Sequence, residues 1–152
     1  MRKIEGLDAC TELRELDLYD NRIKKIEGLD KLINLETLDL AFNRIKEVEN
    51  LEPLVNLKRL FLCSNRFRKI QNLGCLENVE MVDFGDNKLT SIEGIEDVPH
   101  VLEFYAAKNR IKGIHPCIGK LKNLRILGIQ TNDIKKIENL DECEELEEVY
   151  MK

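Results

Sequence analysis

Apolar residues in this chain follow two spacings that alternate along its length. In the stretch 35–43, Leu38 and Leu40 flank the polar Asp39, so in an extended segment the two leucines face one side and the aspartate faces the other. In the following stretch, 45–54, an apolar residue occupies every third position. This spacing suits a short 3₁₀ or α turn, since 3₁₀ side chains eclipse every third residue. The pattern predicts short strands separated by turns and single helical turns.

The same succession of spacings recurs with a nearly fixed period. An asparagine marks each recurrence, with steps of 22 residues and a last step of 23: Asn21, Asn43, Asn65, Asn87, Asn109 and Asn132. Apolar residues precede each asparagine in the order L-x-x-L-x-L-x-x-N, as in 35–43 and 124–132. A period and motif of this kind are typical of a leucine-rich repeat, in which each strand-and-turn unit stacks on the next.

The repeats run through the whole sequence without a linker. Six complete repeats are delimited, with partial repeats at residues 1–12 and 146–152: 13–34, 35–56, 57–78, 79–100, 101–123 and 124–145. We therefore expect a single domain over residues 1–152. Its fold class is α/β, a leucine-rich-repeat solenoid wound as a right-handed superhelix. Short parallel strands line its concave face, and short 3₁₀ or α turns line its convex face.

Asparagine and glycine recur at three positions of the repeat, with a different expected role at each. The asparagines that mark the period are expected to be buried at the strand ends, where their side chains can satisfy backbone groups. Residues just before the helical segment are expected to act as N-caps: Gly28, Asn50, Asn72, Gly94 and Asn139. Residues that close the repeats are expected in a turn with left-handed geometry: Asn34, Asn56, Asn78 and Asn123.

Composition limits the classes of function. The chain is 35% charged and 43% hydrophobic, with a net charge of −5 at pH 7, whereas dedicated nucleic-acid-binding domains are usually strongly basic. Nucleic acid is therefore not an expected partner. No apolar run is long enough to cross a bilayer, so a membrane is not an expected partner either. The first residues lack the apolar region of a secretory signal. The cytoplasm, the nucleus or both are therefore the expected location.

The cysteines agree with a reducing compartment. There are five, with no C-x-x-C spacing. Cys10 and Cys143 occupy a repeat position that is leucine elsewhere, and we expect both to be buried like small apolar residues. Cys63 falls at a repeat position that predicts a more exposed thiol.

No catalytic motif is present. The chain has no phosphate-binding loop, no dinucleotide-binding glycine pattern and no G-x-S-x-G. His100 takes a repeat-closing position and suits a turn, and His115 lies beside Pro116 in the irregular fifth repeat. Neither has a partner at metal-ligand spacing. We expect a protein that is not an enzyme and that needs no cofactor or metal.

Basic residues recur in register just after the asparagine column. They are Arg22, Arg44, Arg66, Lys88 and Arg110, joined by Lys24, Lys25, Arg68, Lys69, Lys112, Lys135 and Lys136. Asp133 breaks the column. Two interpretations are open: a solvated rim whose long side chains cover the turns, or a surface for an anionic partner.

The outward residue at the centre of each strand forms a second column. It reads Asp17, Asp39, Phe61, Asp83, Tyr105, Gly128 and Tyr150. The adjacent leucines already face inward, so the aromatic residues have no core reason to be here. Exposed aromatics among charges are typical of a protein interface, and cross-strand packing on the sheet is the alternative explanation. The candidate protein-binding residues are Asp17, Asp39, Phe61, Asp83, Tyr105 and Tyr150.

The sequence resembles one family over its whole length. The regular 22-residue period, Ile-Glu-Gly-Leu at 26–29, and the strand segments 34–43 and 57–62 are similar to the leucine-rich-repeat regulatory subunit of protein phosphatase 1. The resemblance implies a scaffold that binds the catalytic subunit of this Ser/Thr phosphatase through its concave face. The contacts it implies are Asp39, Phe61, Asp83 and Tyr105. At the last two the family tends to have a longer acid and a phenylalanine.

Two further expectations concern partners. A cytoskeletal or ribonucleoprotein leucine-rich-repeat adaptor is the alternative function, since such proteins share short 22-residue repeats. Solenoid ends are normally covered by a polar capping repeat. The pattern shows none after the last strand expected, residues 146–151, so this strand would present an unpaired edge. The chain is therefore expected to associate end to end.

Overall fold

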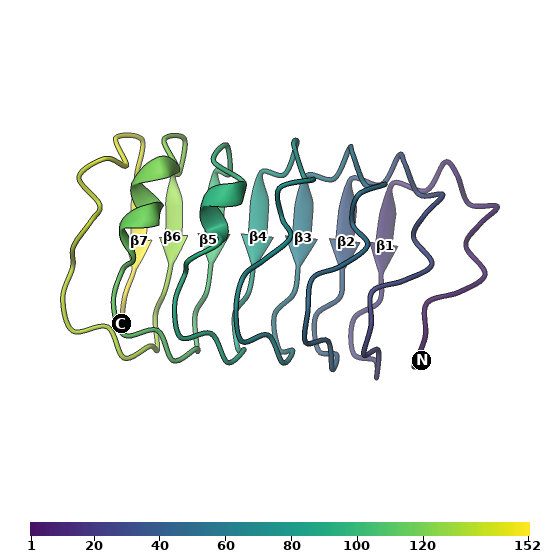
Figure 1. The fold of residues 1–152 in the computed structure, drawn as a ribbon, viewed down its shortest axis with the longest axis horizontal. Coiled ribbons are helices and arrows are strands. Elements are labelled where there is room, and N and C mark those ends of the chain that lie inside the picture. The colour runs from purple at the N-terminus through teal and green to yellow at the C-terminus, as the bar shows by residue number, and fades with distance from the viewer.

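The computed structural model describes residues 1–152 as a stack of repeats with one continuous sheet (Figure 1). Its seven strands are β1 (Glu15–Asp17), β2 (Thr37–Asp39), β3 (Arg59–Phe61), β4 (Met81–Asp83), β5 (Glu103–Tyr105), β6 (Ile126–Gly128) and β7 (Glu148–Tyr150). All pair in parallel with their neighbours in sequence order. The prediction of a solenoid of short parallel strands is confirmed.

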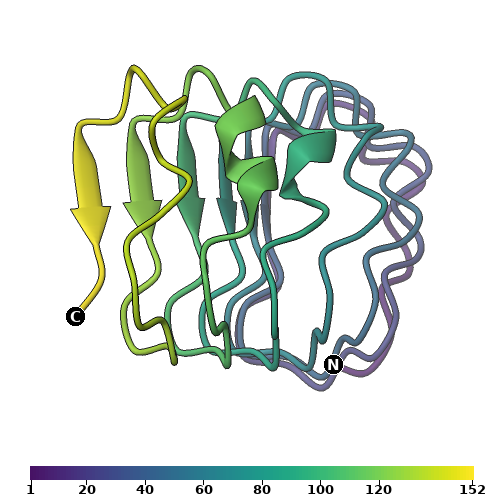
Figure 2. The same cartoon turned by 60° about the vertical axis from the view of Figure 1, so that its left-hand side comes forward.

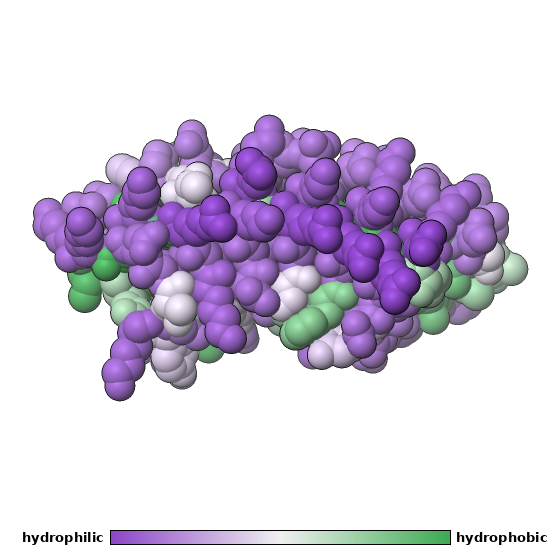
Figure 3. All heavy atoms as spheres, turned by 90° about the horizontal axis from the view of Figure 1, so that it is seen from below, coloured by the Kyte–Doolittle hydropathy of each residue, from purple (hydrophilic) through white to green (hydrophobic).

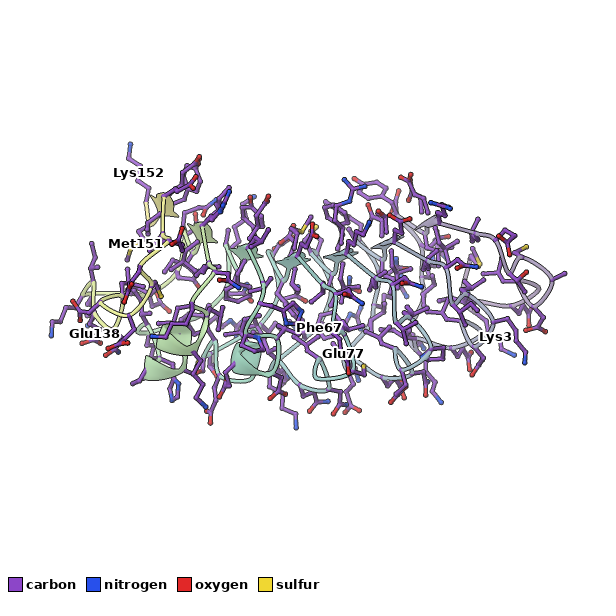
Figure 4. The ribbon with its side chains drawn as sticks, turned by 90° about the horizontal axis from the view of Figure 1, so that it is seen from above. Lys3, Phe67, Glu77, Glu138, Met151 and Lys152 are labelled. Carbon is purple, nitrogen blue, oxygen red and sulfur yellow. The ribbon has the colours of Figure 1, made fainter.

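The strands occupy one long side of the stack, and turns occupy the opposite side (Figures 2 and 4). Seen along the strands in Figure 4, the strand side curves inward, so the sheet forms the concave face. Strand packing explains this shape, because neighbouring strands lie only about 4.8 Å apart while the outer segments are bulkier.

One hydrophobic core runs along the stack between these two sides. It contains 40 buried residues, drawn from both the strands and the outer turns. Leu38 and Leu40 are fully buried, as the alternating pattern predicts, and so are Val48 and Leu54 from the every-third-residue pattern. Phe67, labelled in Figure 4, packs edge to face against Phe84 of the next repeat with ring centroids 5.3 Å apart.

The period-marking asparagines form a ladder of hydrogen bonds between repeats. The buried Asn65 side chain accepts the Ile45 N–H at 2.9 Å and donates to the Leu40 carbonyl at 2.9 Å. It also donates to carbonyls of its own turn. Asn43, Asn87, Asn109 and Asn132 make equivalent bonds. These five asparagines fill the expected role, although only Asn43, Asn65 and Asn87 are buried, whereas Asn21, Asn109 and Asn132 are half-buried.

The two other asparagine and glycine positions differ from the expectation, except that Gly94 is the N-cap of η1 (Ile95–Asp97). Left-handed backbone occurs at Asn50, Asn72 and Asn139, with φ from 57° to 63°, and at Gly28 and Gly94. The three asparagines are not N-caps, since no helix follows them. Their side chains donate to a carbonyl of the preceding repeat, as Asn50 does to Ile26 at 2.6 Å.

The repeat-closing asparagines have no left-handed backbone. Asn34, Asn56 and Asn78 instead donate to a carbonyl of the repeat before. Left-handed backbone also recurs directly before the ladder asparagines, as at Phe42 and Ser64, so most repeats contain two such positions and neither is the repeat-closing one.

Helical structure on the outer side is rarer than predicted. It is limited to two 3₁₀ segments, η1 (Ile95–Asp97) and η2 (Pro116–Lys120), and the other repeats pass through turns. Gly94 caps η1 as expected, with φ 101°. The extra residue of the fifth repeat lengthens η2, where His115 Nδ1 accepts the Cys117 N–H. No helix here has the length and apolar character needed to cross a membrane.

The cysteines follow the prediction with one exception. Cys143 is buried and Cys63 is half-buried, but Cys10 is exposed. The leucine-like position of Cys10 is buried only where a preceding repeat covers it. In residues 1–12 the first turn of the stack has no neighbour on its outer side.

Candidate protein-binding surface on the strand face

The predicted column lies in direct register across the sheet. Asp39 of β2 pairs with Asp17 of β1 and with Phe61 of β3. Phe61 pairs with Asp83 of β4, and Asp83 pairs with Tyr105 of β5. Side chains at paired positions of neighbouring strands lie about 5 Å apart on the same face. Asp39, Phe61, Asp83 and Tyr105 therefore form one contiguous row.

Three aspartates of the column, Asp17, Asp39 and Asp83, also have a structural role that the sequence reasoning missed. Each accepts a hydrogen bond from the backbone N–H two residues later: Asp17 from Tyr19, Asp39 from Ala41 and Asp83 from Gly85, at 2.7–2.9 Å. Aspartate commonly bonds its own backbone in this way. An aspartate that recurs two residues before the start of the turn could have indicated this bond from the sequence. Part of the acidic pattern thus belongs to the repeat itself.

Burial changes the electrostatics of the central acids. It raises the pKa of the Asp83 carboxyl above its usual value, and the backbone bond from Gly85 opposes this only in part. The pKa of Asp39 is raised for the same reason, with a contribution from the Asp17 charge. The half-buried Cys63 thiol lies beside these carboxylates, and burial together with their charges raises its pKa to about 12. Cys63 is therefore a poor nucleophile.

A shallow hollow of about 250 Å³ lies at the β1–β3 end of the row. Its wall includes Asp17, Asp39 and Phe61 together with Arg59, whose Nε donates to the Thr37 hydroxyl at 3.2 Å. An apolar ring, two acids and a guanidinium thus surround one depression. The hollow can accept a side chain that combines an apolar stem with a polar or positively charged end.

Tyr105 lies over a gap in the row. The next strand has Gly128 at the paired position, and the Tyr105 ring occupies the space that a side chain there would fill. The Tyr105 hydroxyl donates to Glu103 at 2.9 Å. Burial and this carboxylate raise the pKa of Tyr105 to about 12. The ring is therefore held neutral and fixed in orientation.

Tyr150 stands apart from the central row. It is half exposed on β7, at the end of the sheet, and its hydroxyl donates to Glu148. Gly128 separates it from Tyr105. The structure places Asp17 and Tyr150 at the two ends of the column, with the other four predicted residues between them.

A second aromatic group borders the N-terminal part of the strand face. The Tyr19 and Phe42 rings lie 4.9 Å apart and are 51% and 46% exposed. They follow β1 and β2, close to the acids of the column. Aromatic residues are enriched at protein interfaces, so this pair extends the candidate binding surface.

Comparison with known proteins agrees with this repeat structure. A family model for two copies of leucine-rich repeats matches residues 11–53. The chain has the leucine-rich-repeat fold. Among solved structures, an internalin (inlF) of Listeria monocytogenes superposes with a TM-score of 0.86 at 20% identity, over 99% of this chain and 44% of that one. Internalin C2 of the same bacterium gives 0.80 at 24% identity, over 100% and 76%.

A leucine-rich-repeat protein of Leptospira interrogans is also similar, with a TM-score of 0.79 at 25% identity over 91% of this chain and 37% of that one. The chain thus spans less than half the length of two of these three structures. No curated protein matches it. Leucine-rich-repeat solenoids typically use their extended concave surface to bind proteins.

Proposed function

We propose that this chain is a non-enzymatic scaffold that binds the catalytic subunit of a Ser/Thr protein phosphatase, protein phosphatase 1, through its strand face. The observation that carries the proposal is the unbroken row Asp39, Phe61, Asp83 and Tyr105 on four adjacent strands. The strand sequences that resemble the phosphatase regulatory subunit supply the identity of the partner. The proposed place of action is the cytoplasm or the nucleus.

The chemistry of the row suits a protein partner. Phe61 and Tyr105 provide rigid aromatic area, and aromatic residues at the centre of an interface often carry much of the binding energy. Asp39 and Asp83 alternate with them and complement basic groups of a partner, which favours one register over others. The hollow beside Phe61 and Arg59 adds a place for one inserted side chain.

The proposal is tested by titrating purified phosphatase catalytic subunit into the purified chain in a calorimeter. We expect saturable binding with a stoichiometry of one to one. A negative heat-capacity change should accompany it, because apolar surface of the strand face becomes buried. Absence of binding at micromolar concentrations of both proteins would remove the phosphatase as the partner.

A further inference from the structure

A band of basic side chains runs along the side of the solenoid where the strands end. Figure 3, which views this underside, shows it dominated by strongly hydrophilic residues. We define the basic band by its nine exposed members: Arg22, Lys24, Arg44, Lys46, Arg66, Arg68, Lys88, Arg110 and Lys112. The basic band lies beyond the C-terminal ends of the strands and is separate from the row on the strand face.

The backbone holds the band in register. Each basic residue that follows a ladder asparagine donates its N–H to a carbonyl of the preceding repeat, as Arg44 does to Ile23 and Arg66 to Ile45, both at 2.8 Å. Lys88 and Arg110 make the same bond. The band therefore repeats at the strand spacing of about 4.8 Å over five repeats, or about 19 Å in all.

The charges of the band lack partners within the chain. The six ion pairs of the structure all involve other basic residues. No side-chain hydrogen bond of a band member occurs either. Positive charges stacked at this spacing repel one another, and an anion lying along them would relieve the repulsion. The whole chain has a net charge of −5, so a band of nine basic residues is a local excess of positive charge on an acidic protein.

Two depressions are built from these side chains. The larger, of about 580 Å³, is lined by Lys46, Glu47, Arg66, Arg68, Lys69 and Lys88. The other, of about 300 Å³, is lined by Arg2, Arg22, Lys24 and Arg44. Neither has an apolar wall residue, so neither suits an apolar ligand. Both suit carboxylates or phosphates held by several cations.

We propose that the basic band binds an extended segment rich in Asp and Glu on a partner protein. A strand rises about 3.3 Å per residue, so the band matches about six extended residues. Arginine can hold carboxylates in bidentate pairs. Single-stranded nucleic acid is the less suitable occupant, because domains dedicated to nucleic acid are usually strongly basic and this chain has a net charge of −5. This site does not depend on the phosphatase proposal.

The test uses a fluorescein-labelled peptide of ten glutamates and measures its fluorescence polarisation with the full chain. At about 50 mM salt we expect saturable binding that weakens at least tenfold at about 300 mM, since salt screens exposed charges. A ten-glutamine peptide should not bind. A single-stranded thymidine oligonucleotide of similar charge should bind more weakly than the glutamate peptide.

The matched variants change the net charge equally. Arg44→Glu with Arg66→Glu and Lys88→Glu alters the band, whereas Lys31→Glu with Lys120→Glu and Lys152→Glu alters exposed lysines outside it. The band variant should lose at least about tenfold in affinity, and the control variant should stay within about twofold. Thermal melts of both variants check that they fold. Equal losses in the two variants, no binding of the glutamate peptide, or tighter binding of the oligonucleotide would overturn the proposal.

Discussion

Tyr105 and Gly128 fit together across two neighbouring strands. A Cβ atom at Gly128 would lie 2.6 Å from Cδ1 and 3.3 Å from Cε1 of the Tyr105 ring, which is closer than atoms can approach without movement. The absence of a side chain at position 128 therefore sets the orientation of Tyr105. Glu103 holds the other end of the ring through the hydroxyl.

Gly128→Ala is predicted to weaken phosphatase binding although no proposed contact residue is substituted. The added methyl forces the Tyr105 ring to rotate away, and a displaced central aromatic can cost about 2 kcal/mol of binding, or roughly 30-fold in affinity. Because the ring can move, folding stability should fall by no more than about 1.5 kcal/mol. Calorimetry and a denaturant melt measure the two effects.

Gly74→Ala is the control for this variant, since its Cβ would meet nothing closer than 4.0 Å. Its binding should match the parent chain. Equal binding by Gly128→Ala and the parent would show that the Tyr105 ring does not contribute to the interface in its observed orientation.

Asn65→Ala is predicted to destabilise the solenoid. The buried amide accepts the Ile45 N–H and donates to the Leu40 carbonyl. Its loss leaves the Ile45 N–H unpaired, which costs about 1–3 kcal/mol, and removes further bonds to carbonyls such as that of Leu40, which keeps its bond from Asn43. The free energy of unfolding in urea should fall by about 2–4 kcal/mol. Asn56→Ala removes one exposed bond to Ile33 and should cost about 1 kcal/mol or less. Similar losses in the two variants would argue against the ladder as the main polar support.

Asp83 should make stability depend on pH. Its pKa is raised in the folded chain, so the folded state binds its proton more tightly than the unfolded state does. This contribution favours folding at low pH and is lost as pH rises from the unfolded value, near 3.8, through the raised folded value. Asp83→Asn keeps an oxygen to accept the Gly85 N–H and removes the buried charge.

The Asp83→Asn chain should therefore be more stable than the parent at pH 7, and the difference should shrink as pH falls toward 3.8. Urea melts at a series of pH values measure this. Asp17→Asn is the control, because Asp17 makes the same turn bond while exposed to solvent. A pH-independent difference at position 83 would contradict burial as its cause.

The regular part of the fold was predictable from the sequence because each repeat has the same spacing of apolar residues and asparagine. Leu38, Leu40 and Asn43 alternate or recur at spacings that only a strand followed by a buried asparagine satisfies, and the structure places them accordingly. The outer segments were less predictable. An apolar residue at every third position fits both a 3₁₀ helix and an extended turn, so only η1 and η2 became helical.

The surface was predictable in position but not in interaction. The alternation of side chains along a strand placed Asp39 and Phe61 on the solvent-facing, concave side of the sheet. The register followed from the equal repeat lengths. The turn bonds of the aspartates and the fit of Tyr105 to Gly128 depend on backbone geometry and side-chain rotamers. Neither property is encoded in a spacing.

The chain of residues 1–152 is predicted to associate through the end of its sheet. The outer edge of β7 is unpaired, and Val149 and Tyr150 are 40% and 50% exposed there. Unpaired strand edges with exposed apolar residues favour pairing with another chain. Light scattering should show a mass that rises with concentration. A constant monomeric mass at millimolar concentration would refute this.

The double variant Phe61→Ala with Tyr105→Ala tests the central claim most directly. Calorimetric titration with the phosphatase catalytic subunit should show binding by the parent chain and a loss of at least about a hundredfold in the variant, since two interface aromatics at about 2 kcal/mol each are removed. The melting temperature should stay nearly unchanged, because both rings lie on the solvent-facing, concave side of the sheet and not in the core. Parent-like affinity in a folded double variant would contradict the assignment of the strand face as the binding surface.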